Sequence, residues 1–64
     1  MSLSSRDVIA KLKAEGWYEV RQKGSHVQFK HKILKGLVTV PHPKHDLPVG
    51  TLRSIERQAN IRLR

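Results

Sequence analysis

Residues 17–30 read WYEVRQKGSHVQFK, and this stretch decides the fold of the chain. Its first part, Trp17–Arg21, has the composition of a β-strand. Gln22–Ser25 is typical of a turn, because Gly24 can take a positive φ. His26–Lys30 alternates polar and apolar side chains, which predicts a half-buried strand. We therefore expect a β-hairpin.

The alternation in the second strand assigns its side chains to two faces. Val27 and Phe29 are expected to point toward the core. The opposite face then carries His26, Gln28 and Lys30. A polar, basic surface is therefore predicted on the side of the sheet away from the core.

A helix is predicted before the hairpin, over about Ser5–Glu15. Ser4 and Ser5 are both suitable N-cap residues, and Ser4 with Asp7 has the spacing of a capping box. Gly16 can end the helix in a left-handed conformation. An apolar stripe at helical spacing faces the core, made of Val8, Ile9 and Leu12.

The C-terminal half predicts a third strand and a second helix. Leu37–Val40 has strand composition, and Pro41 is expected to end it because proline lacks the N–H that the sheet requires. Residues 41–46 are expected to be extended. Pro48 can occupy the first turn of the helix, and Asn60 can terminate it. Its buried stripe is predicted to be Val49, Leu52, Ile55 and Ala59.

These elements give one α+β domain over residues 1–64, in the order α-β-β-β-α. Both helices are expected on one face of a three-stranded antiparallel sheet, with the other face open. A chain of 64 residues buries only about 60% of its unfolded surface. It leaves little room for a deep pocket, so no small-molecule substrate is expected.

Charge is the strongest compositional signal. Thirteen Lys and Arg face five Asp and Glu, for a formal net charge of +8. Such a field favours a polyanionic partner: nucleic acid, an acidic protein or an anionic membrane. A membrane partner is not expected, because the apolar face of the second predicted helix is needed to cover the sheet. The chain contains no cysteine. We find no signal peptide and no apolar run near the ~20 residues that span a membrane, and we expect a cytoplasmic protein.

Three blocks of sequence carry a family resemblance. They are Gly24-Ser25-His26 with Phe29, then Leu37–Pro43, then Leu47 with Gly50-Thr51-Leu52, Ile55 and Gln58-Ala59. In this order they resemble the HicA family of toxins, and the resemblance covers about Ser5 to Ile61. Asn60 departs from the pattern, in which glycine is common, but asparagine tolerates the same backbone.

The resemblance implies an mRNA interferase from a bacterial toxin–antitoxin pair. It implies a fold like that of double-stranded-RNA-binding domains, with His26 as the catalytic residue. It also implies a HicB-like antitoxin that neutralises the toxin by covering His26. RNA and this antitoxin are thus the expected partners, and no cofactor is expected.

The residues themselves support a ribonuclease. RNA supplies its own nucleophile, the 2′-hydroxyl, so an enzyme needs a base near that group and cations near the developing charge. Histidine exchanges a proton near neutral pH, and His26 shares its face with basic residues. Lys23, in the turn, is expected to hold a phosphate. RNA contacts are predicted for Lys23, Gly24, Ser25, Gln28 and Lys30.

Several alternatives stay open at this point. His26 can act as base or as acid, with the base favoured, and spacing does not decide whether His42 reaches the site. A metal site is not predicted, because the histidine-bearing loop has no acidic cluster. Two rival functions are a non-catalytic double-stranded-RNA-binding module and a basic protein that only binds an acidic partner. Both rivals predict that His26→Ala leaves biological activity intact.

Overall fold

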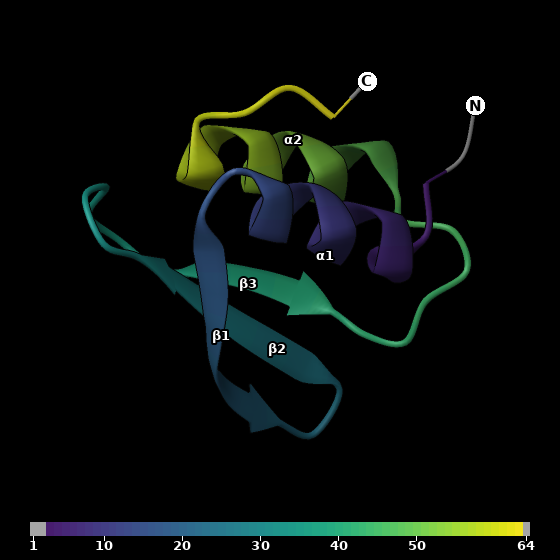
Figure 1. Ribbon diagram of the computed structural model, residues 1–64. Helices are drawn as coiled ribbons and strands as arrows, with labels where there is room; N and C mark the ends of the chain where they lie inside the picture. The colour runs from purple at the N-terminus through teal and green to yellow at the C-terminus, as the bar shows by residue number, and fades with distance from the viewer. Residues whose placement is uncertain (1–2, 64) are drawn as a thin grey trace.

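Two helices and three strands follow one another in the order expected from the sequence (Figure 1). The computed structural model describes residues 3–63. Within them, the predicted order α-β-β-β-α is confirmed. The elements are α1 (Ser5–Ala14), β1 (Trp17–Lys23), β2 (His26–His31), β3 (Val38–Pro41) and α2 (Val49–Ala59).

The three strands form one antiparallel sheet in the order β1-β2-β3. Both helices lie on the same side of it (Figure 1). Helix α1 contacts β1 and β3, and α2 contacts β3. The predicted α+β architecture, with two helices on one face, is confirmed. No helix within residues 3–63 has the length and apolar character needed to cross a membrane.

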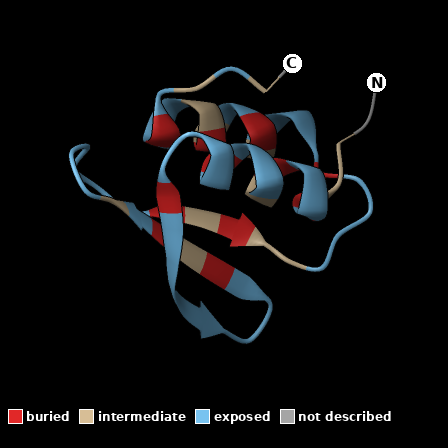
Figure 2. Cartoon of the chain, viewed as in Figure 1, coloured by how far each residue is buried: buried red, intermediate tan, exposed pale blue. Residues whose placement is uncertain are grey.

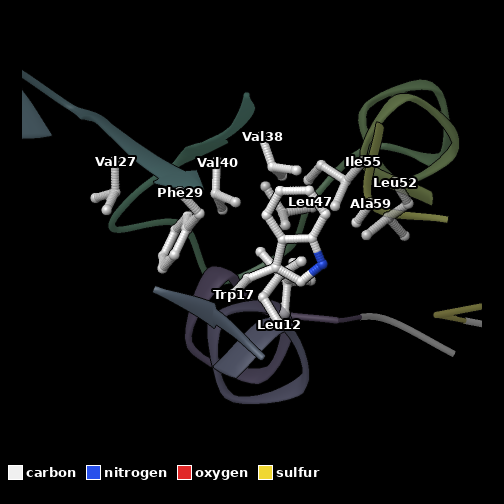
Figure 3. Packing of buried hydrophobic residues seen from close by; sticks show 11 residues of the cluster. Leu12, Trp17, Val27, Phe29, Val38, Val40, Leu47, Leu52, Ile55 and Ala59 are labelled. Carbon is white, nitrogen blue, oxygen red and sulfur yellow. The ribbon is translucent and has the colours of Figure 1, made fainter. Parts of the chain in front are cut away.

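The core lies between the helices and the sheet (Figures 2 and 3). Strand β2 contributes Val27 and Phe29, which are buried as the alternation predicts, and β1 contributes Trp17. The helices and the remaining segments complete the cluster with Val8, Leu12, Val38, Val40, Leu47, Leu52, Ile55 and Ala59. No element within residues 3–63 covers the face of the sheet away from the helices.

Helix α1 begins with the capping box that the spacing of Ser4 and Asp7 predicts. The Ser4 side chain accepts a hydrogen bond from the Asp7 backbone N–H at 3.1 Å, and the Ser4 N–H donates to the Asp7 carboxylate at 3.1 Å. After the helix, Gly16 has a φ of +95°, as expected for a left-handed stop.

The predicted first and last residues of the third strand are both wrong by one position. Leu37 lies outside β3, and Pro41 is its last residue. The His42 N–H donates to the Ser25 carbonyl at 2.8 Å, so the next pair inward, Pro41 and His26, is a non-hydrogen-bonded pair. The Pro41 nitrogen therefore faces the open edge of the sheet, where proline is tolerated.

The start of the second helix also differs from the prediction. Pro48 is the N-cap, with extended backbone, and the helix begins at Val49. The Val49 side chain is 53% exposed, so its assignment to the buried stripe is wrong. In the first turn its position faces solvent, and the buried side chains of α2 are Leu52, Ile55 and Ala59. Asn60 ends the helix with a φ of +55°, as predicted.

Candidate active site

A tight hairpin turn sets the position of His26. The loop between β1 and β2 contains only Gly24 and Ser25, because Lys23 belongs to β1 and pairs with His26. The prediction that placed Gln22 and Lys23 in the turn is therefore wrong by two residues. Gly24 has a φ of +58° and Ser25 does not have a positive φ, which is the pattern of a type II′ turn.

His26 lies in a row that crosses the whole sheet. Its cross-strand neighbours are Lys23 on β1 and Pro41 on β3. Directly opposite residues in an antiparallel sheet project from the same face. The alternate residue Val27 is buried under the helices, so this row projects from the open face. His26 thus stands beside a lysine on an uncovered surface.

The next rows of the open face are also polar and basic. Gln28 pairs with Arg21 and Thr39, and Lys30 pairs with Tyr18. A hollow of about 310 Å³ opens on this face. It is lined by Val20, Arg21, Gln28, Lys30 and Leu37. Of the predicted RNA-contacting residues, Gln28 and Lys30 line the hollow, whereas Lys23, Gly24 and Ser25 lie at the turn.

Arg21 was missed by the sequence reasoning because of a β-bulge. Strict alternation from Trp17, which is buried, would place Arg21 on the helix-covered side. The register shifts between Glu19 and Arg21, so that Arg21 pairs with Gln28 and Lys23 pairs with His26. A bulge inserts one extra residue and re-aims the side chains that follow. It thereby adds a third cation, Arg21, to the face that carries Lys23 and Lys30.

The histidines differ in how their rings are held. The Nδ1 of His31 accepts hydrogen bonds from the N–H groups of Ile33 and Leu34, so its Nε2 donates to the Glu15 carbonyl at 3.0 Å. That ring also packs edge-on against Trp17. His42 is tied through Nδ1 to Ser5 Oγ at 2.6 Å. The hydrogen bonds of the His31 and His42 rings therefore stabilise the fold.

The His26 ring, in contrast, is exposed and makes no hydrogen bond within the described part of the chain, 3–63. Its ring is free to meet a ligand. Within the same residues, no group of three or more His, Asp and Glu gathers closely enough to hold a metal ion.

Comparison with known proteins shows to which family the chain belongs. A family model described as the HicA toxin of bacterial toxin–antitoxin matches residues 5–61. This chain belongs to the HicA toxin family. The resemblance inferred from the three sequence blocks is thereby confirmed, and the chain has the role of a toxin in a bacterial toxin–antitoxin pair.

A solved structure supports the same assignment. It is described as a HicA3 and HicB3 toxin–antitoxin complex, and the chain matched in it is 29% identical, with a TM-score of 0.84. The match covers 97% of the present HicA chain and 100% of that chain. No curated protein sequence matches the chain. The HicA fold is thus shared over nearly its whole length.

Proposed function

We propose that this HicA toxin is an endoribonuclease that cleaves mRNA with His26 and without a cofactor. The observation that carries the proposal is the placement of His26. Its ring stands on the open face next to Lys23, exposed and free of hydrogen bonds within residues 3–63, whereas His31 and His42 are each held by the fold. His45 is exposed as well, but it lies in the connection after β3. His26 is therefore the exposed histidine of the open face and the proposed acid–base group.

The reaction follows from the chemistry of RNA. His26 takes the proton of a ribose 2′-hydroxyl, and the resulting oxygen attacks the adjacent phosphorus. The bond from phosphorus to the 5′-oxygen breaks, and that oxygen takes up a proton. The products are a 2′,3′-cyclic phosphate and a 5′-hydroxyl. Removal of such a base costs about 10²–10⁴-fold in rate.

The cations around His26 stabilise the charge that develops on the phosphate. Lys23 is its direct cross-strand neighbour, and Arg21 and Lys30 lie in the following rows of the same face. Preorganised positive charge lowers the barrier most where the transition state is more negative than the substrate. The same side chains bind the RNA backbone, and this part of the affinity falls steeply with salt.

The same face is the proposed docking surface for a HicB-like antitoxin. Beside the cations it exposes apolar side chains, with Tyr18, Val20 and Leu37 each 39–46% exposed. A partner that offers acidic and apolar groups would match both features, and would cover His26. The related HicA3 chain is found in a complex with HicB3. The proposed substrate of the present toxin is mRNA, so we propose that it acts in the cytoplasm.

Expression of wild-type protein and His26→Ala in cells tests the proposed function. Wild type is expected to arrest growth and fragment messages, and His26→Ala to do neither while keeping its circular dichroism spectrum. Lys13→Ala, at an exposed position on α1, is the control and should behave as wild type. Growth arrest by a folded His26→Ala variant would favour the two non-catalytic rivals, the double-stranded-RNA-binding module and the basic partner-binding protein.

A further inference from the structure

A second hollow lies beside the hairpin turn, on the flank of the molecule where α1 begins. Its volume is about 330 Å³. It is lined by the start of α1, Ser4–Arg6, and by the connection that follows β3, His42–His45. The two segments are nearly 40 residues apart in sequence, and the fold brings them together at this place. The proposed function does not use this hollow.

A buried serine builds the wall of the hollow. Ser5 is only 1% exposed, and its N–H donates to the Lys44 carbonyl at 2.8 Å. Its Oγ accepts from the Lys44 N–H at 2.9 Å and lies 2.6 Å from His42 Nδ1. The connection is therefore fixed to α1 by both backbone and side-chain bonds. A hydrogen bond at one ring nitrogen orients the other, so Nε2 is the His42 nitrogen left for a ligand.

The lining of the hollow is cationic. Arg6, Lys44 and His45 are exposed there beside His42, and none of the described residues contributes a carboxylate to the lining. Asp7, next to Arg6 in sequence, is engaged by the N–H and hydroxyl of Ser4. Asp46, next to His45, is exposed and lies outside the lining. A guanidinium fork, an ammonium and imidazole N–H groups are the donors that hold phosphate oxygens. The chemistry therefore suits a phosphate group.

The hollow lies next to the hairpin turn that precedes His26. The His42 N–H donates to the Ser25 carbonyl at 2.8 Å, and the preceding residue, Pro41, is the cross-strand neighbour of His26. Two residues of chain thus separate the His26 row from Lys44 in the lining. A strand of RNA whose scissile phosphate lies at His26 can follow this edge of the sheet into the hollow.

We propose that the hollow formed by Ser4–Arg6 and His42–His45 is a second phosphate subsite, which seats a backbone phosphate of the RNA strand that His26 cuts. The proposal rests on the proposed ribonuclease function for the direction of the strand. Arg6, Lys44 and the Nε2 of His42 bind the phosphate oxygens. Since the contact is made equally in the ground state and the transition state, it lowers KM without raising kcat.

Binding of a fluorescent 2′-O-methyl RNA ten-mer tests the subsite, because this probe keeps its phosphates and lacks the nucleophile. The variant is Arg6→Gln/Lys44→Gln, and the matched control is Lys11→Gln/Lys13→Gln, which removes the same charge from exposed positions of α1 outside the hollow. We expect the Arg6/Lys44 variant to bind about tenfold or more weakly. The control should lose about twofold or less through the screened long-range field.

Two further readouts separate a phosphate contact from a general loss of charge. The plot of log K against log salt has a negative slope, and in the Arg6/Lys44 variant this slope should become shallower by about 0.7 for each lost phosphate contact. With a cleavable RNA, KM should rise by the same factor as the dissociation constant while kcat stays unchanged. The RNA should also shift the backbone amide resonances of Arg6, Lys44 and His45 in wild type.

Equal weakening in the two double variants would overturn the subsite. It would also be overturned if the Arg6/Lys44 variant lost affinity for a poly-glutamate peptide but kept its affinity for the RNA probe, because the hollow would then serve an acidic protein. The two proposals fail separately. A protein that cuts no RNA but shows the binding difference loses only the nuclease function, and one that cuts RNA without that difference loses only the subsite.

Discussion

Ser5→Ala is expected to destabilise the protein far more than the same change one residue earlier. Ser5 Oγ contacts His42 Nδ1 at 2.6 Å, the Lys44 carbonyl at 3.2 Å and the Lys44 N–H at 2.9 Å. Ser5 is buried, so water does not replace these bonds freely. Alanine would leave the partly buried Lys44 N–H without its acceptor.

The structure allows the size of the effect to be worked out. Each lost hydrogen bond contributes about 0.5–1.5 kcal/mol, and an unsatisfied buried donor costs about 1–3 kcal/mol. The free energy of unfolding should therefore fall by about 2–4 kcal/mol in Ser5→Ala. Ser4→Ala removes the N-cap oxygen that binds the Asp7 N–H, which costs typically ~1 kcal/mol. In a domain of this size 1 kcal/mol shifts Tm by about 4–8 °C.

Thermal melts of the two variants, followed by circular dichroism at neutral pH, provide the assay. We expect Tm to fall by about 10–25 °C for Ser5→Ala and by about 4–8 °C for Ser4→Ala. Equal Tm values in the two variants would refute the reasoning, because the bonds between α1 and the β3–α2 connection would then contribute no more than a helix cap.

Two further predictions concern the glycines and the helix cap. Gly16→Ala should lower the free energy of unfolding by about 2–4 kcal/mol, because φ is +95° and the new Cβ would lie 2.7 Å from His31 Nε2. Gly24→Ala should lower it by only about 1–2 kcal/mol, because φ is +58° and the new Cβ would meet no atom of the described residues within 4 Å. Urea midpoints measure both, and equal losses would contradict the contact with His31. The Ser4 N–H and hydroxyl, with Arg6 nearby, hold the pKa of Asp7 below its ordinary 3.8. Because the pKa is lower in the folded state than in the unfolded state, ionised Asp7 stabilises the fold above about pH 4. This stabilisation is lost as the pH falls through the folded-state pKa. Melts between pH 6 and pH 2.5 should show the gap between wild type and Asp7→Asn closing below about pH 4, and a constant gap would be inconsistent with an ionised Asp7 in the cap.

The features predictable from the sequence are those specified by neighbouring residues. The capping box of Ser4 and Asp7, the alternation through Val27 and Phe29, and the left-handed Asn60 each depend on a few adjacent positions, and each is confirmed. Local signals of this kind are read from spacing alone. They were sufficient to predict the order of elements and the face on which His26 lies.

The features that were missed depend on contacts between distant segments. Arg21 reached the open face through a bulge, and no residue type in β1 marks the place of that bulge. Ser5 looked like an alternative N-cap, whereas its role is set by His42 and Lys44, 37 and 39 residues later. Val49 fitted the apolar stripe of α2 by spacing, but the first turn of the helix turns it toward solvent.

Catalysis by His26 is tested by the rate at which purified protein cleaves an end-labelled RNA in the presence of EDTA, compared between wild type and His26→Gln. We expect 2′,3′-cyclic phosphate ends from wild type and a rate about 10²–10⁴-fold lower in the variant. Equal rates in the two proteins, or loss of wild-type cleavage on adding the chelator, would contradict this expectation.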